Sequence, residues 1–142
     1  MTASAWFNSV TEGRAHLRKM LDAAARGLPA GLRRDQAAFA LVDGERLRRF
    51  LEVQARQPEV IAEADGWSIF IPNTPLSADG PTLAEAATDM IDALREYATD
   101  WTERLHAAPN HADNWWIPQL SAVSTDDELS SWLTAGQLAG QA

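Results

Sequence analysis

The sequence predicts an α+β fold of two small modules: a strand-helix-strand-strand-helix unit, then a β-hairpin with one long helix. Short apolar segments bounded by turn residues are typical of strands. Longer segments repeat apolar residues at every third or fourth position, as helices do. Charge divides the 142-residue chain as well. Residues 1–57 carry ten Lys or Arg and six Asp or Glu, a net +4, whereas residues 58–142 carry two and fourteen, a net −12. We therefore expect two domains, 1–57 and 58–142.

Length and composition exclude several classes of protein. A chain of this size cannot form a large catalytic barrel. It has no cysteine, which excludes disulfides and thiolate metal sites. No apolar run reaches the roughly 18–20 residues that span a bilayer. The first residues lack the basic start and apolar run of a signal peptide. We expect a cytoplasmic protein.

The first module begins with a short apolar strand at residues 4–8. Ser9-Val10-Thr11-Glu12 has the form of a capping box and opens a helix predicted over 10–26. Gly27 and Pro29 end that helix.

Two strands follow, at 31–34 and 37–42, with Asp35-Gln36 as their turn. Asp43 can cap a helix over 44–56, whose apolar stripe would comprise Leu47, Phe50 and Leu51. We expect Arg46, Arg48 and Arg49 of this helix to be surface or interface residues. A module of about 55 residues buries little core, so a second copy would stabilise it.

The second module is more clearly patterned. Val60 and Ile61 could lengthen the preceding helix. The Asp65-Gly66 turn precedes the strand 67–71, and 76–78 could form a second strand. Thr82-Leu83-Ala84-Glu85 is a further capping box, and it opens the strongest helix, predicted over 82–106.

The remaining residues show weaker patterns. After Pro109 the sequence indicates a loop up to the Ile117-Pro118 pair. A last amphipathic helix is predicted over 125–133. The small, polar tail 134–142 is expected to fray.

Motifs in residues 3–55 resemble the Phd/YefM antitoxins. Thr11-Glu12-Gly13-Arg14-Ala15-His16-Leu17 is similar to their Ser-Glu-Ala-Arg-x-x-Leu start. Arg34-Asp35, Ala40-Leu41-Val42 and Asp43-Gly44-Glu45-Arg46-Leu47 resemble three later runs of that family. The chain departs from the pattern by lacking a glycine at Asp35-Gln36 and by carrying Gly13 in place of a good helix former.

The resemblance implies a dimeric antitoxin that binds its own operator DNA and represses transcription. It implies that Arg14, near the start of the first helix, approaches the DNA. We add Arg18, Arg33 and Arg34 on charge and position. Helix N-termini and arginines bind phosphate, and arginine also reads guanine. Alternatively, these arginines only solvate helix faces.

Residues 64–105 resemble the HicB-type antitoxin module, in which an antiparallel sheet lies against a long helix. Partner toxins of the RelE/ParE class are often basic, so an acidic stripe on the 82–106 helix could be a docking face. Tryptophans suit interface anchors, but they could equally be core residues, and the stripe could be a solvated face. The toxin-binding candidates are Glu85, Asp89, Asp92, Glu96, Trp115, Trp116 and Trp132.

Catalytic patterns are weak. His106, His111 and Asp113 match no metal-ligand spacing. The nucleophile elbow and the phosphate-binding loop are missing from the sequence. We therefore expect no enzyme, metal or cofactor. The favoured hypothesis is a type II antitoxin that neutralises a basic toxin; the alternative is a dimeric protein-interaction module without DNA binding.

Overall fold

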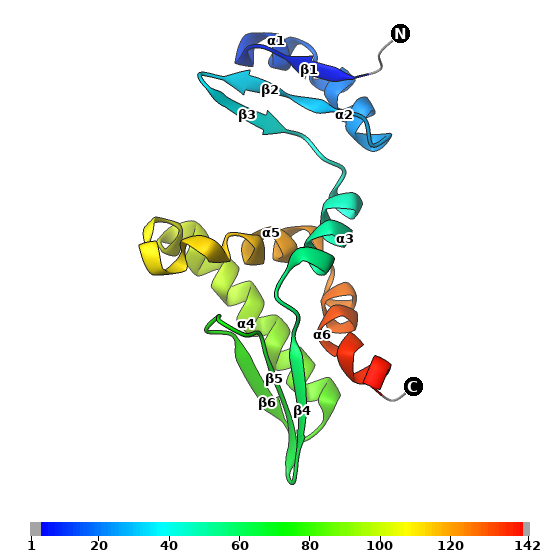
Figure 1. Ribbon diagram of the computed structural model, residues 1–142, viewed down its shortest axis with the longest axis vertical. Coiled ribbons are helices and arrows are strands. Elements are labelled where there is room, and N and C mark those ends of the chain that lie inside the picture. The colour runs from blue at the N-terminus through cyan, green and yellow to red at the C-terminus, as the bar shows by residue number, and fades with distance from the viewer. Residues whose placement is uncertain (1–3, 141–142) are drawn as a thin grey trace. The chain divides into compact units, whose positions relative to one another are not determined.

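The computed structural model describes residues 4–140, with side chains described for 4–136. The chain has the predicted α+β composition and divides into two compact units, residues 1–47 and 48–142, called here the N-terminal and C-terminal units (Figure 1). The division lies inside helix α3 (Gly44–Gln54), before position 57.

The N-terminal unit is a three-stranded sheet with two helices. β2 is central, parallel to β1 and antiparallel to β3. Asp35, in the turn between β2 and β3, adopts a left-handed φ of 56°. Aspartate tolerates this conformation, which explains how the turn forms without glycine. The elements are β1 (Ala5–Phe7), α1 (Val10–Ala15), α2 (Leu17–Ala25), β2 (Ala30–Arg34) and β3 (Ala37–Ala40).

The single helix predicted over 10–26 is wrong in one respect, because it breaks at His16. The backbone of His16 has φ −121° and ψ 27°, outside the helical region. Its ring Nδ1 lies 2.9 Å from the carbonyl oxygen of Glu12, and the ring stacks on Phe7. These two contacts fix the histidine at the junction between α1 and α2.

The core of the N-terminal unit is small. Apart from Met20, its fully buried apolar residues are alanines, namely Ala5, Ala23, Ala24 and Ala30. Since burial energy scales with apolar area, such a core contributes little.

The end of α2 is closed by a Schellman motif. Gly27 is left-handed at φ 74°, and the Leu28 N–H donates to the Ala23 carbonyl at 2.9 Å. The Arg46 guanidinium also donates to the carbonyls of Ala24 and Ala25, at 3.3 and 3.1 Å.

The C-terminal unit contains a second antiparallel sheet, ordered β4 (Glu59–Glu63), β5 (Gly66–Phe70) and β6 (Ser77–Gly80). Val60 and Ile61 therefore belong to a strand, and the expectation that they extend the helix is wrong. Val60 pairs with Ile69 and Ile61 with Ser68. The predicted hairpin thus becomes a three-stranded sheet.

Helix α4 (Leu83–Glu103) runs along this sheet (Figure 1). It contacts β5, β6, α5 and α6, and its buried side includes Met90 and Leu94. Leu120 and Leu133, from α5 and α6, are buried as well.

Two predictions about the C-terminal residues were wrong. The loop expected from Pro109 to the Ile117-Pro118 pair is instead the 3-10 helix η2 (Pro109–Asn114) followed by the start of α5 (Trp116–Val123). Pro118 lies in the first turn of α5, where a helix tolerates proline.

Helix α6 (Asp126–Gly140) continues beyond position 133 through most of the expected tail; residues 141–142 lie outside the described residues. A short 3-10 helix, η1 (Leu105–Ala107), follows α4.

In α3, Leu51 is buried as expected, whereas Phe50 is exposed. The predicted apolar stripe therefore does not lie on one buried side of that helix.

Candidate functional site

The four candidate DNA-binding arginines are exposed, but they do not form one patch. Alternation along β2 sends Leu32 and Arg34 to one side of the sheet and Arg33 to the other. Helix α1 covers the side of the sheet on which Leu32 lies. Gly13 of α1 packs so closely on Leu32 that a Cβ added to the glycine would lie 2.6 Å from Leu32 Cδ2. Arg14 and Arg34 therefore belong to the helix-covered side, and Arg33 to the open side. The exposed candidates are Arg14, Arg18, Arg33 and Arg34.

Aromatic rings hold the two strand arginines. The guanidinium carbon of Arg33 lies 5.8 Å from the Trp6 ring centroid, and that of Arg34 lies 5.3 Å from the Phe39 ring centroid. Cation–π contacts of this kind restrain the side chain and leave its N–H edges available for other acceptors.

The N-terminus of α1 is capped by side chains of the chain itself. The Glu12 N–H donates to Ser9 Oγ at 3.1 Å, and the Asn8 N–H donates to Glu12 Oε2 at 3.2 Å. A phosphate at this position would meet the Glu12 carboxylate. DNA contact by this unit would therefore depend on arginine side chains rather than on the helix N-terminus.

The predicted acidic stripe lies on α4 with all four carboxylates exposed. Its 4-3-4 spacing keeps them on one side of the helix, opposite the buried side that includes Met90 and Leu94. The stripe comprises Glu85, Asp89, Asp92 and Glu96.

The three candidate tryptophans separate into core and surface. Trp115 is 53% exposed, whereas Trp116 and Trp132 are 9% and 6% exposed. The two buried rings pack edge-on, with centroids 6.2 Å apart. The assignment of Trp116 and Trp132 to a toxin-binding surface is therefore corrected: they are core residues, and Trp115 is the accessible member of the set.

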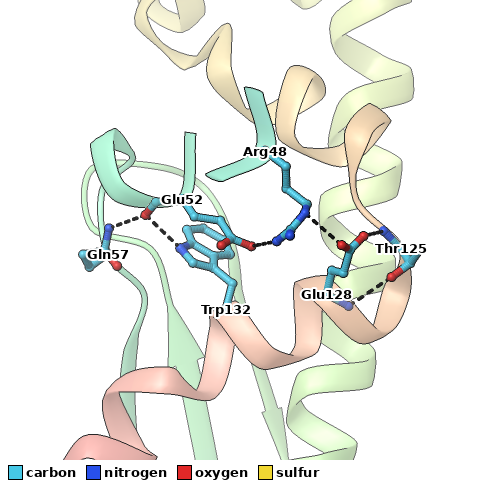
Figure 2. A network of polar contacts seen from close by, with 6 residues as sticks. All are labelled: Arg48, Glu52, Gln57, Thr125, Glu128 and Trp132. Atoms are coloured by element: carbon cyan, nitrogen blue, oxygen red, sulfur yellow. Dashed lines mark hydrogen bonds and ion pairs between the residues drawn. The ribbon is translucent and has the colours of Figure 1, made fainter. Parts of the chain in front are cut away.

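A polar network that the sequence did not reveal joins α3 to α6 (Figure 2). The Arg48 side chain is only 13% exposed, with Nη1 2.8 Å from Glu52 Oε1 and Nε 2.8 Å from Glu128 Oε2. Trp132 Nε1 donates to the Glu52 carbonyl at 3.3 Å. Arg48 is thus a cross-link between helices rather than a surface residue. The local sequence indicates only the Thr125–Glu128 capping box, in which the backbone N–H of each residue donates to the side chain of the other; it positions Glu128 at the start of α6 but does not point to Arg48.

The histidines of the C-terminal unit are bonded within the fold. His106 Nδ1 lies 2.8 Å from the Trp101 carbonyl, and His111 Nδ1 lies 2.9 Å from the Tyr97 hydroxyl. Among the described residues, no group of three or more His, Cys, Asp or Glu could hold a metal ion. In that same part of the chain, no helix is long and apolar enough to cross a membrane.

Comparison with known proteins identifies the family. Residues 6–132 match the PHD_like family model, described as the antitoxin of toxin-antitoxin, RelE/RelB, TA systems. No curated protein matches the chain. A crystal structure from Syntrophomonas wolfei subsp. wolfei, described as the antitoxin part of a proposed toxin/antitoxin system, shares the fold. It has a TM-score of 0.69 and 19% identity, over 93% of this chain and 96% of that one. Since the family match spans most of the sequence, the chain belongs to this family of toxin-antitoxin antitoxins.

Proposed function

We propose that this chain is the antitoxin of a type II pair: its C-terminal unit binds and neutralises a RelE- or ParE-like toxin, and its N-terminal unit dimerises and binds operator DNA to repress transcription. Family membership supports the toxin partner. Neutralisation would be by occlusion, which requires no chemistry, so we propose no enzymatic activity.

Charge is the observation that carries the division of roles. The N-terminal unit carries seven Lys or Arg and five Asp or Glu, a net +2; the C-terminal unit carries five and fifteen, a net −10. A phosphate backbone favours the first unit and a basic protein the second. Element order also supports the finer assignments. The β1-α-β2-β3 arrangement fits a Phd/YefM-like domain, and the sheet with α4 fits a HicB-like module.

A second copy is proposed to cover apolar surface of the N-terminal unit. Leu17 and Leu21 lie one turn apart on α2 and are each about half exposed, and Phe39 of β3 is similarly exposed. The alanine-rich core of this unit leaves much of its apolar surface unburied, so dimerisation would stabilise it.

Operator binding is tested by a gel shift with the DNA upstream of the gene, at several salt concentrations. Arg14→Ala and Arg34→Ala should each weaken binding and reduce its salt dependence. Arg56→Ala, which removes an exposed arginine of the C-terminal unit, is the matched control. Failure to bind even at low salt would contradict operator binding.

That failure would favour the alternative, a dimeric interaction module without DNA binding. The observation behind this alternative is Glu12, whose carboxylate occupies the N-terminus of α1. Glu12→Gln distinguishes the two: it should strengthen binding if DNA approaches α1, and it should change nothing if the module does not bind DNA.

A further inference from the structure

We infer that the C-terminal unit docks its basic protein partner on the side of the β4-β5-β6 sheet that α4 leaves uncovered. This inference rests on the proposed function for the partner being a toxin. Ile69 of β5 is fully buried, on the side facing α4. Side chains alternate along strands, and paired residues share a side. The opposite side is here named the open sheet face. It includes Glu59, Ile61, Glu63, Ser68, Phe70 and Asp79.

Exposure shows that this face lacks a covering layer in the described chain. Ile61 is 46% exposed, and Glu59, Glu63 and Asp79 are exposed too. Phe70 is partly exposed; because Glu59 pairs with Phe70 and Ile61 with Ser68, Ile61 and Phe70 are diagonal neighbours. They form an apolar centre bordered by carboxylates.

The exposed carboxylates of this face suit a cationic partner. The Ser68 hydroxyl lies 3.0 Å from Glu63 Oε1 and 2.5 Å from Asp79 Oδ1, but it has one proton to donate. The two carboxylates thus converge on one hydroxyl that cannot satisfy both. Of the six residues that define the open sheet face, none is basic. An arginine or lysine of a partner would satisfy the remaining acceptors and relieve the repulsion between the carboxylates.

The acidic stripe on α4 does not combine carboxylates with exposed apolar residues. Within residues 85–96 the only exposed residue besides the four carboxylates is Thr88, and its hydroxyl already donates to the Ala84 carbonyl. Interfaces depend on a few apolar or aromatic anchors within a polar rim. The open sheet face has such anchors and the stripe does not. Because the stripe lies on the side of α4 away from its buried residues, the two surfaces can be altered separately.

The test uses the full-length chain and the purified protein encoded by the neighbouring gene, with titration calorimetry at two salt concentrations. Glu63→Gln with Asp79→Asn should raise Kd at least about tenfold and reduce its salt dependence. Asp89→Asn with Asp92→Asn removes the same two charges from the stripe and should change Kd less than about threefold. Ile61→Ser should raise Kd without changing the salt dependence.

The outcomes separate the inference from the proposed function. If the unmodified chain does not bind the neighbouring protein, the proposed function fails. If it binds and the stripe variant loses as much affinity as the sheet variant, or the sheet variant loses none, the inference is overturned. Removing two close carboxylates should leave the Tm of the chain unchanged or higher, so a lower Tm accompanied by lost affinity would also count against it. A change in molar mass of the free sheet variant would show that a second copy occupies this face, which overturns the inference as well.

Discussion

Arg48 is predicted to be the principal electrostatic link between α3 and α6. Arg48→Met keeps most of the aliphatic stem but removes the cation that lies between Glu52 and Glu128 (Figure 2). The two carboxylates would then face each other across a partly buried space. Glu128→Gln is milder, because its side-chain oxygen can still accept from the Thr125 N–H.

The magnitude follows from the two contacts. A hydrogen bond to a charged group contributes roughly 1.5–3 kcal/mol to the free energy of unfolding. Because both glutamate side chains are partly exposed, we place each Arg48 contact at or below the lower end of that range. We expect Arg48→Met to lower the free energy of unfolding by about 2–3 kcal/mol and Glu128→Gln by about 1 kcal/mol. The coupling energy between them should be about 1 kcal/mol.

The assay is urea unfolding of the full chain, followed by circular dichroism and by tryptophan fluorescence. Trp132 donates to the Glu52 carbonyl, so one of the six tryptophans that contribute to the emission belongs to this network. Arg56→Met, at an exposed arginine beyond the end of α3, is the matched control and should stay within about 0.5 kcal/mol of the unmodified protein. A coupling energy below about 0.3 kcal/mol would refute the reasoning.

Three further predictions are checked by thermal unfolding. Arg95→Met removes bonds from the guanidinium to the Ser121 and Ser124 carbonyls at the end of α5, and should destabilise the C-terminal unit by about 2 kcal/mol; an unchanged Tm would contradict this role. Trp116→Ala should lower the free energy of unfolding by about 3–5 kcal/mol, because it leaves a cavity in the core, whereas Trp115→Ala should leave it nearly unchanged. Equal effects of the two substitutions would show that Trp116 is not a core residue. Gly27→Ala should lower the free energy of unfolding by about 1 kcal/mol, because alanine is strained at the φ of 74° that Gly27 adopts. Gly136→Ala should raise it by up to about 1 kcal/mol, because Gly136 lies within helix α6 and an added Cβ would meet open space.

Local signals accounted for most of the elements. The capping boxes at Ser9 and Thr82 begin α1 and α4 as predicted, and each hydroxyl accepts the expected N–H. The turn at Asp35 was also located. These features depend on residues within four positions of one another, so their physics is visible in the sequence.

Two of the errors came from pairing between residues that local periodicity does not connect. Val60 becomes a strand residue because it pairs with Ile69, and Arg48 becomes a cross-link because α6 brings Glu128 to it. Neither partner can be found from local periodicity, since tertiary pairing overrides weak local preference.

The candidate surfaces show the same limit. Alternation within β2 already implied that Arg33 and Arg34 point to opposite sides, but the sequence does not tell which side α1 covers. That information lies in Gly13, which seemed a departure from the expected pattern and proves to be the point where α1 meets Leu32. The sequence also left open which tryptophans are buried, because Trp115 and Trp116 are adjacent and only the packing of α5 separates them.

The network on α3 also determines where the protein can be divided for experiment. A fragment that begins at residue 58 would lack Arg48 and Glu52, leaving Glu128 without its guanidinium and Trp132 without its carbonyl acceptor. A fragment that begins at residue 44 retains the whole of α3 together with its bonds to α6. Truncations meant to isolate the acidic half should therefore start upstream of α3, because a cut at the change in charge would remove part of the structure that it was meant to isolate.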